Sequence, residues 1–321
     1  MNKKNRSKKK LNNNNFSVLK NNSKLLKFKN ILRFTNKKNY ANNFGYQWNK
    51  FSKTQLLDKK NEFKKINSQR FFNSTNWKKK ELSGQKILEV GSGAGRFSEV
   101  VLNSTKAHLY SIDYSTAVDA NYSNNYKKKF KKRFFLYQSS VYNMPFKNNI
   151  FDKAFCFGVL QHTPNVERVI FSIAKKLKIG GEIVVDFYPL KGFYTFFQAK
   201  YLLRLITKKM SNDKLFQIIN NYVDIMMKIY FFLRKIKLGF FTRILPIVDI
   251  HNTLPNLEIK NLRENVVLDT FDMLSPKYDS PQKFSKIIKI FNKLNIKVNF
   301  YGFIKYGNNL KVAVVRGLKI K

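Results

Sequence analysis

The chain has 321 residues, 43% of them hydrophobic, enough for a sizeable core in one elaborated domain or two small ones. Its single cysteine, Cys156, excludes an internal disulfide and a cysteine-rich metal site, which favours a reducing, cytoplasmic compartment. The formal charge of +43, from 62 Lys and Arg against 19 Asp and Glu, points to nucleic acid or an anionic membrane, unless it reflects the codon drift of an AT-rich genome.

The N-terminal stretch, residues 1–43, is dominated by Lys and Asn and is too polar and charged to bury much surface. It has no apolar signal-peptide core, and it is Lys-rich where a transit peptide is Arg- and Ser-rich. We expect a mobile, basic tail, with a nucleic-acid-binding arm as the alternative. Residues 44–80 begin with an aromatic cluster and continue into an amphipathic helix through Phe63 and Phe71, so order is predicted to start here.

A glycine-rich stretch runs from Lys86 to Phe97, where an apolar strand carrying Glu89 leads into glycines at 91, 93 and 95. The glycines let a ligand approach the backbone, and the amides at the following helix start favour a negatively charged group. The dinucleotide fingerprint would place its third glycine at position 96, which is Arg96 here. The spacing therefore weakens a dinucleotide interpretation.

Strands and helices alternate from Lys86 onward, which predicts an α/β fold with a doubly wound, mostly parallel sheet. The predicted strands are 86–90, 108–113, 134–139, 151–157 and 182–187, and the helices are 95–103, 115–131 and 166–177, the last closed by Gly180 and Gly181. A helix over 282–294 and an antiparallel hairpin of 297–303 with 311–316 close the chain. Ligands of such sheets bind at the carboxyl ends of the strands.

The second predicted strand ends in Asp113, 22 residues after Gly91. A carboxylate there can accept both hydrogen bonds of a ribose diol, and Tyr114 can flank an adenine. A helix N-cap ahead of Ser115 is the structural alternative for Asp113.

Together, the acid and glycine spacing, Asp113 and the run Gly158-Val159-Leu160-Gln161-His162-Thr163-Pro164 resemble the class I S-adenosylmethionine-dependent methyltransferases, in particular the type 11 family. The resemblance implies a Rossmann-like domain over 81–190 and 265–321, an enzyme, and S-adenosylmethionine as cofactor. It implies cofactor-binding roles for Glu89, Gly91, Ser92, Gly93, Gly95, Asp113, Tyr114, Ser140, Phe157 and Gly158. Ser140 departs from the aspartate that the family uses there to bind the adenine amine, and a hydroxyl accepts that bond more weakly.

His162 is the first candidate for a catalytic base, because it follows the fourth strand beside the cofactor and titrates near neutrality. A structural histidine bonded to backbone is the alternative. Tyr188 and Asp272 are the next candidates. His108 and His251 lack metal-ligand spacing, and we predict no metal site.

Residues 191–264 have a helical pattern and are predicted to form an inserted lid over the domain. No apolar run reaches transmembrane length. Lys235, Lys237, Arg243 and the pair Phe240 and Phe241 leave peripheral contact with an anionic membrane as an alternative.

An acidic cluster, with three carboxylates between Asp269 and Asp279, stands out from the basic background. We interpret it as a substrate-facing loop in which Asp269, Asp272 and Tyr278 bind substrate or supply a base, with turn and cap roles as the alternative. Trp48 is either a ligand contact or a packing residue of the lead-in segment.

Three functions follow as hypotheses. The first is methyl transfer to a small-molecule or glycan acceptor enclosed under the lid. The second is an RNA methyltransferase that uses the basic tail and surface, although no recognised RNA-binding module is present. The third is an S-adenosylmethionine-binding protein without turnover. The sequence does not indicate the acceptor or the oligomeric state.

Overall fold

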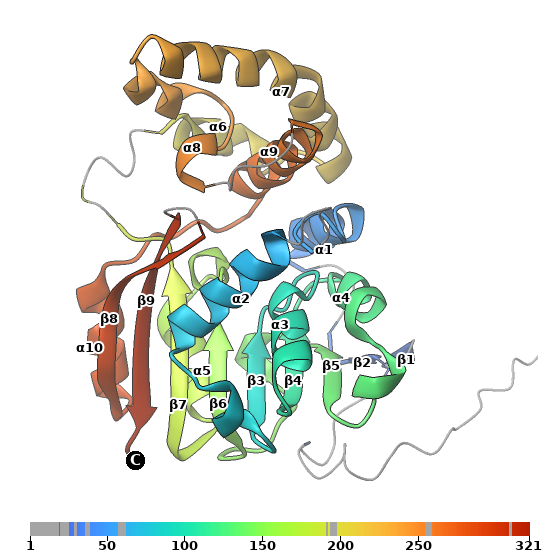
Figure 1. Cartoon of the computed structure of the whole chain (residues 1–321), viewed down its shortest axis with the longest axis vertical. Coiled ribbons are helices and arrows are strands. Elements are labelled where there is room, and N and C mark those ends of the chain that lie inside the picture. The colour runs from blue at the N-terminus through green and yellow to red at the C-terminus, as the bar shows by residue number, and fades with distance from the viewer. Residues whose placement is uncertain are drawn as a thin grey trace, which may run out of the picture.

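The computed structural model of the chain describes residues 19, 26–28, 31–35, 39–56, 62–190, 192, 198–253, 259–307 and 310–321. They form one nine-stranded sheet, with helices on both faces and a helical layer above one end (Figure 1). The strands are β1 Leu26–Phe28, β2 Ile31–Arg33, β3 Lys86–Val90, β4 His108–Asp113, β5 Phe134–Gln138, β6 Phe151–Cys156, β7 Leu177–Phe187, β8 Ile296–Tyr306 and β9 Leu310–Lys319.

The helices follow the apolar periodicity of the sequence. They are α1 Asn42–Lys50, α2 Glu62–Thr75, α3 Arg96–Ser104, α4 Val118–Asn125, α5 Val166–Ala174, α6 Ala199–Thr207, α7 Asn212–Lys235, α8 Ile250–Thr253, α9 Ile259–Leu274 and α10 Phe284–Lys293. Short 3₁₀ turns include η4 Val141–Asn143, η5 Leu160–His162 and η7 Gly239–Ile244.

The strand order is β1-β2-β5-β4-β3-β6-β7-β9-β8. Strands β2 to β7 pair in parallel along this order, whereas β1 and the β8–β9 hairpin are antiparallel. This confirms the predicted doubly wound, mostly parallel sheet with its C-terminal hairpin. The carboxyl ends of β3 to β7 therefore meet at the edge that faces the helical layer (Figure 1).

The sheet separates two apolar cores. In register, Leu88 lies between Tyr110 and Ala154, and this row packs against α5 and α10. The opposite face buries Phe155 and Val184 against α2, α3 and α4. A third core joins α7 to α9 and includes Phe51, just after α1. The helical layer is thus anchored through the lead-in segment as well as through its own ends.

The order of the chain begins earlier than predicted. Within residues 1–43, β2 extends the sheet by pairing in parallel with β5, and Leu19 forms an isolated bridge with Phe146. Ile31 and Leu32 are buried in this strand, so two apolar residues in a polar stretch suffice to extend the sheet. Most of the predicted tail lies outside the described residues.

Three predicted boundaries are wrong. Gly180 and Gly181 do not close α5 but lie within β7, whose first residue, Leu177, already pairs with Phe151. The helix predicted over 115–131 is divided into α4 and a 3₁₀ turn at Lys128–Phe130. The acidic segment is not all loop, because Asp269 and Asp272 lie on the last turns of α9. Helix α9 packs on α7, so the helical layer extends to Leu274.

Candidate functional site

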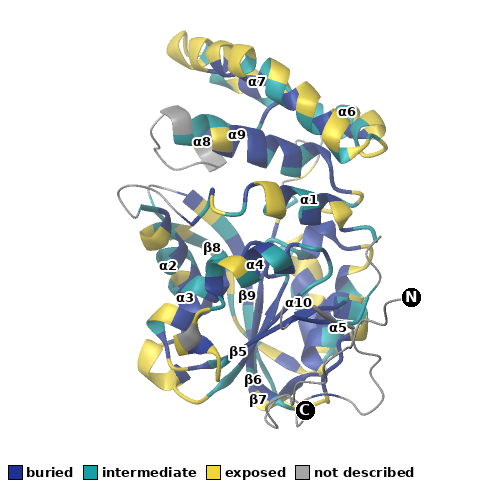
Figure 2. Ribbon diagram, turned by 90° about the vertical axis from the view of Figure 1, so that its right-hand side faces the viewer, coloured by how far each residue is buried: buried dark blue, intermediate teal, exposed yellow. Residues whose placement is uncertain are grey.

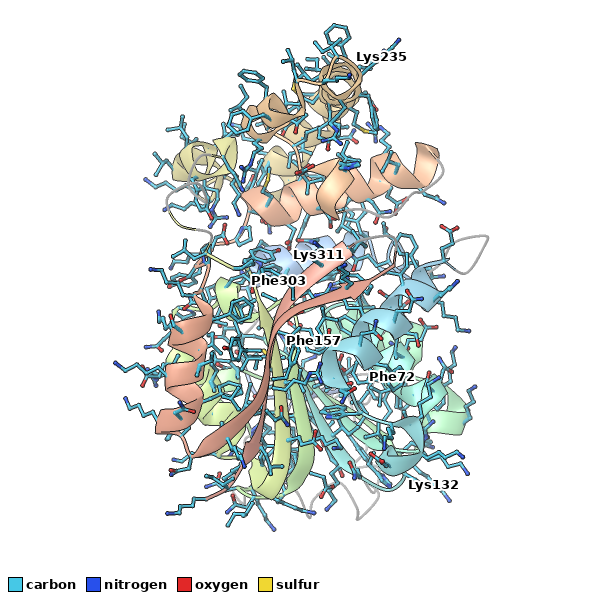
Figure 3. All side chains as sticks on the ribbon, turned by 60° about the vertical axis from the view of Figure 1, so that its left-hand side comes forward. Phe72, Lys132, Phe157, Lys235, Phe303 and Lys311 are labelled. Carbon is cyan, nitrogen blue, oxygen red and sulfur yellow. The ribbon has the colours of Figure 1, made fainter. Side chains whose placement is uncertain are left out.

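A cavity of about 1280 Å³ lies between the carboxyl edge of the sheet and the helical layer. Twelve of the sequence-predicted site residues line it together: Trp48, Gly91, Ser92, Gly93, Asp113, Tyr114, Phe157, Gly158, His162, Tyr188, Asp269 and Asp272. Glu89, Gly95, Ser140 and Tyr278 lie outside its wall. In Figure 3, Phe303 and Lys311, which also line the cavity, lie near the end of the β8–β9 hairpin closest to the helical layer.

The glycine loop after β3 forms the floor of this cavity. Gly91 has φ of 78°, and a Cβ there would lie 2.1 Å from Val159 Cγ2, so the position requires glycine. The amide of Gly93 donates to Asp113 Oδ2 at 2.9 Å. The hydroxyl of Ser92 is buried and has no partner among the described residues. A buried hydroxyl that has no hydrogen-bond partner and lines a cavity fits a polar ligand bound there.

Asp113 connects the loops after β3 and β4. Besides the Gly93 amide, it accepts the Ser115 amide at 2.8 Å and the Ser115 hydroxyl at 2.7 Å. Burial raises the pKa of Asp113, while these hydrogen bonds oppose the rise. A carboxylate has about four lone-pair sites, so acceptor capacity is left for a ligand diol in the cavity. The N-cap alternative is wrong, because the N-cap of α4 is Ala117 and Asp113 binds Ser115 in the turn before the helix.

Glu89 and Gly95 support the glycine loop and do not line the cavity. Glu89 is buried and accepts hydrogen bonds from the hydroxyls of Ser98 and Ser111, which join β3 to α3 and β4. Burial raises its pKa to about 7, although both hydroxyls oppose the rise. A Cβ on Gly95 would lie 2.2 Å from Asn121 Oδ1, so this glycine allows α3 to approach α4. Both residues shape the loop without lining the cavity.

Gly158 opens directly onto the cavity. Its φ is 70°, and no atom lies within 4 Å of the position a Cβ would take. Its amide donates to Asp186 Oδ1, and Asp186 Oδ2 forms an ion pair with Arg70 at 2.6 Å. Asp186 and Arg70 were missed in the sequence. Asp186 could have been predicted from the sequence, because it lies near the carboxyl end of β7 as Asp113 does on β4. Arg70, from α2, has no sequence pattern that indicates a site residue.

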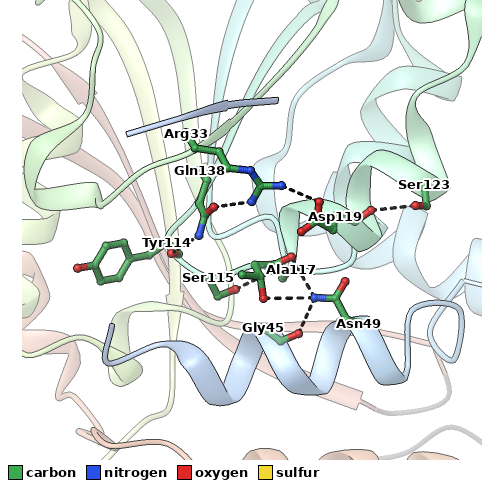
Figure 4. Close-up of polar contacts among 10 residues, drawn as sticks. Arg33, Gly45, Asn49, Tyr114, Ser115, Ala117, Asp119, Ser123 and Gln138 are labelled. Carbon is green, nitrogen blue, oxygen red and sulfur yellow. Dashed lines mark hydrogen bonds and ion pairs between the residues drawn. The ribbon is translucent and has the colours of Figure 1, made fainter. Parts of the chain in front are cut away.

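The lead-in segment covers the side of the cavity that contains the glycine loop. Trp48 lies over the glycine loop, with its Nε1 3.2 Å from the Cβ position of Gly93. Gln47, also missed, lines the cavity with a buried side-chain amide that has no partner among the described residues. Figure 4 shows contacts that attach the segments before β3 to the sheet and α4: Arg33 of β2 binds Gln138 and Asp119, and Asn49 of α1 donates to the Thr116 carbonyl.

His162 and Tyr188 form the wall that faces the helical layer. The His162 ring packs on Phe44 and Tyr188, with ring centroids 5.1 and 5.6 Å apart. His162 Nδ1 is 3.2 Å from the carbonyl oxygen of Tyr278. Because a carbonyl only accepts, this bond places the proton on Nδ1 and leaves Nε2 of the neutral ring as an acceptor. Tyr278 therefore orients the histidine through its backbone.

Ser140, the position where the resemblance implied adenine recognition, caps η4 instead, with its hydroxyl accepting the Tyr142 amide at 3.2 Å. The neighbouring Ser139 lines the cavity. Tyr40, which precedes the lead-in segment, packs near Tyr114 with ring centroids 5.1 Å apart and planes tilted by 52°, and it also lines the cavity. Aromatic surface therefore borders the predicted adenine position from two segments.

Charged groups surround the part of the cavity nearest α9. Burial raises the pKa of Asp269 to about 7; Asp272 adds to the rise, and the guanidinium groups of Arg96 and Arg70 oppose it. The desolvated surroundings of the Tyr188 hydroxyl, together with Asp272, also raise its pKa, although 40% of the whole residue is exposed. The wall thus offers a tyrosine hydroxyl donor and two carboxyl groups, of which Asp269 has a pKa raised to about 7.

Two absences hold for the part of the chain that the structure describes. Within those residues, no group of three or more His, Cys, Asp and Glu side chains is placed to bind a metal ion. None of the described helices has both the length and the apolar composition needed to cross a bilayer.

Comparisons with known proteins agree with this geometry. Residues 88–185 match the family model of the methyltransferase domain. The chain is 30% identical to phosphoethanolamine N-methyltransferase 2 of Caenorhabditis elegans over 112 residues, 34% of this chain and 25% of that protein. It is 30% identical to sterol 24-C-methyltransferase ERG6B of Gibberella zeae over 101 residues, 30% of this chain and 26% of that protein. The chain thus spans about a quarter of the length of these curated relatives.

A solved structure shares the fold. A chain from the complex between the Haloferax volcanii Trm112 methyltransferase activator and a methyltransferase aligns with a TM-score of 0.51 at 8% identity, covering 87% of this chain and 98% of that one. The family match begins in β3 and ends in β7, and so contains the glycine loop, Asp113 and Gly158. Residues 88–185 are therefore similar to the methyltransferase domain of the class I S-adenosylmethionine-dependent enzymes, which supports S-adenosylmethionine as the cofactor.

Proposed function

We propose that the protein transfers a methyl group from S-adenosylmethionine to a small-molecule or glycan acceptor enclosed beneath the helical layer. The observation that supports this best is one cavity shared by the glycine loop and the charged wall of α9. Its volume of about 1280 Å³ exceeds the ~300–1,000 Å³ of ordinary small-molecule sites, which leaves room for donor and acceptor together.

The residues on the floor fit the cofactor. Asp113 would accept the ribose hydroxyls, Tyr114 and Tyr40 would flank the adenine, and the loop from Gly91 to Gly93 would approach the methionine part with its backbone. The unpaired Ser92 hydroxyl supports a polar ligand at this place. Gly158 supports a close approach from the other side, because a side chain there would occupy the cavity.

The acceptor would lie toward α9. When bound, S-adenosylmethionine supplies a methyl group on a positively charged sulfur that is already activated for transfer. The work left to the protein is to align the acceptor, exclude water and remove a proton where the acceptor is poorly acidic. We assign proton removal to His162 Nε2, with Asp269 or Asp272 as alternatives. The Tyr188 hydroxyl would donate to the acceptor and fix its orientation.

The position between the sheet edge and the helical layer suits a compact acceptor. The cavity wall carries both signs of charge, because Asp269 and Asp272 lie with Arg70 and Arg96, and Asp279 pairs with Lys200. The two curated relatives are named for small acceptors, phosphoethanolamine and a sterol. The position and these names support the small-molecule assignment over the RNA alternative.

A labelled methyl-transfer screen tests the proposal. Purified protein is incubated with methyl-labelled S-adenosylmethionine and separate small-molecule, glycan, lipid and RNA fractions, and label is followed into each. We expect transfer in a small-molecule or glycan fraction, loss of transfer in Asp272→Asn, and unchanged cofactor affinity in that variant by calorimetry. Label in RNA alone would overturn the acceptor class. Cofactor binding without transfer to any fraction would leave a binding protein.

A further inference from the structure

The outer end of the helical layer carries an apolar–basic patch. It consists of exposed side chains from the second half of α7 and from η7: Ile225, Ile229, Phe232, Ile236, Leu238, Phe240, Phe241 and Ile244, with Lys228, Lys235, Lys237 and Arg243 among them. Phe240 is 70% exposed, an unusual value for an aromatic side chain. Figure 2 shows exposed residues along the outer side of α7, and Figure 3 places Lys235 at this end.

Helix α7 is apolar on two sides, although only one of them packs. Leu215, Ile219, Val223, Met227 and Tyr230 are buried and repeat at helical spacing against α9. Ile218, Ile225, Ile229, Phe232 and Ile236 repeat at seven, four, three and four residues, so they form a second stripe on one side of the helix. This second stripe is exposed. An aligned, exposed aliphatic stripe indicates a surface that contacts an apolar phase.

The charge around the part of the stripe after Asp224 has a single sign. Between Asp224 and Asp249 the sequence contains no acidic residue, whereas it contains five cations, Lys228, Arg234, Lys235, Lys237 and Arg243. Aliphatic residues flanked by Lys and Arg are the composition of helices that lie in the headgroup region of anionic membranes. Single-stranded nucleic acid prefers aromatic platforms on which bases stack, and most of this patch is aliphatic.

The patch also borders the cavity. Gly239, Thr242 and Arg243 of η7 line its wall, while Phe240, Phe241 and Ile244 of the same turn are exposed outside. Arg234, at the end of α7, packs on Gly239, where a Cβ would lie 2.9 Å from its Nη1. One turn of chain therefore separates the outer apolar surface from the cavity.

We propose that the apolar–basic patch docks on an anionic phospholipid bilayer, with Phe240 and Phe241 inserted at the level of the headgroups and the lysines on lipid phosphates. Docking would place the η7 side of the cavity against the membrane. The proposal concerns a binding surface and stands whether or not the acceptor class proposed above is correct.

Vesicle sedimentation tests the docking, with matched controls for the high overall charge. Binding is measured to phosphatidylcholine vesicles with and without phosphatidylglycerol. We expect the protein to prefer the anionic vesicles, and Phe240→Ser/Phe241→Ser to weaken that binding about tenfold or more, since burial of one Phe contributes ~1.5–3 kcal/mol. Ile179→Ser, which alters a side chain 69% exposed at the far end of β7, should leave binding unchanged.

Two further comparisons between variants separate docking from bulk electrostatics. Lys235→Gln/Lys237→Asn should weaken vesicle binding more than Lys131→Gln/Lys132→Gln, which removes equal charge; Figure 3 shows Lys132 at the opposite end. Phe240→Trp should give fluorescence that brominated lipid quenches, and Ile179→Trp should not. Equal effects of both lysine pairs together with no quenching would overturn the proposal. So would loss of a dimer in Phe240→Ser/Phe241→Ser without any change in vesicle binding.

Discussion

At the scale of single residues, the site depends on carboxyl groups in two different settings. Asp113 has fixed backbone and hydroxyl partners, so its carboxylate is oriented before any ligand arrives. Burial and Asp272 raise the pKa of Asp269 to about 7, while Arg96 and Arg70 oppose the rise. The first setting suits binding, and the second suits a group that changes protonation during a reaction.

Replacing Asp113 with Asn is expected to weaken cofactor binding. The amide keeps the shape of the side chain but loses the charge and one acceptor face, and a charge-assisted hydrogen bond contributes ~1.5–3 kcal/mol. Calorimetry with S-adenosylhomocysteine should therefore show an affinity roughly 10–100-fold lower. The control is Asp152→Asn, because Asp152 pairs with Lys178 outside the cavity. Affinity equal to that of the unchanged protein would remove Asp113 from the ribose assignment.

Replacing Asp269 with Asn should stabilise the fold at alkaline pH. The folded pKa of about 7 exceeds the unfolded value of 3.8, so the folded state binds more protons between these values and loses stability as pH rises through them. Asn removes that cost, and Tm should rise more at pH 8.5 than at pH 5. If the Asp269 carboxylate contacts the acceptor, methyl transfer by Asp269→Asn at pH 8.5 should be slower than methyl transfer by the unchanged protein.

The control is Asp224→Asn, for which we expect a change in Tm of the opposite sign. Hydrogen bonding from Arg263 lowers the pKa of Asp224 on the surface of α7, so its ionised form stabilises the fold. Asp224→Asn should therefore lower Tm slightly at pH 8.5 and leave methyl transfer unchanged. A rise in Tm that is equal at both pH values for Asp269→Asn would contradict the raised pKa.

At the scale of elements, three glycines share a left-handed backbone but differ in what surrounds them. Gly84, Gly95 and Gly158 have φ of 74°, 89° and 70°. The Cβ positions of Gly84 and Gly158 are open, whereas that of Gly95 meets Asn121 and Asn125 within 2.3 Å. Gly158 lines the cavity, and Gly84 does not. The three positions therefore separate backbone strain, packing and ligand contact.

Alanine at each of these glycines should give three different outcomes. Strain alone should cost about 1–2 kcal/mol in Gly84→Ala and Gly158→Ala, and overpacking should add about 1–3 kcal/mol in Gly95→Ala. Urea unfolding measures these differences. S-adenosylhomocysteine affinity should fall in Gly158→Ala and stay unchanged in Gly84→Ala. Equal affinity in both would show that the donor does not approach Gly158.

Elements with strong local patterns were predicted well, and those determined by tertiary contacts were not. Glycine spacing and strand ends located Asp113 and the loop, because both depend on short-range chemistry. Helix α9 was missed at Asp269 and Asp272 because its acidic face borders the cavity rather than solvent, which hides the usual apolar period. β2 was missed because a three-residue strand carries little local signal and depends on its pairing with β1 and β5. Gln47 and Arg70 carry no local signal, since distant elements bring them to the site.

At the scale of the whole molecule, the net charge of +43 does not describe every surface of the protein. The cavity wall near α9 carries Asp269 and Asp272 together with Arg70 and Arg96, whereas the apolar–basic patch has only cations. An acceptor that reaches the cavity must therefore tolerate carboxylates, even though the molecule attracts polyanions over long range. Attraction of RNA to this protein would not by itself indicate an RNA substrate.

Removing residues 1–18 tests that distinction. The cut precedes Leu19, which bridges Phe146, and so leaves the edge strands β1 and β2 intact; removing residues 1–43 would delete them. The segment contains six Lys and Arg and no acid. If all six contact phosphates, the slope of log affinity for single-stranded RNA against log salt should decrease by up to about 4. Methyl transfer to a small acceptor should not change, because every residue to which we assign donor or acceptor binding comes after residue 18. A parallel loss of transfer and RNA binding would instead support RNA as the acceptor, since only a polyanionic substrate would need these cations for turnover.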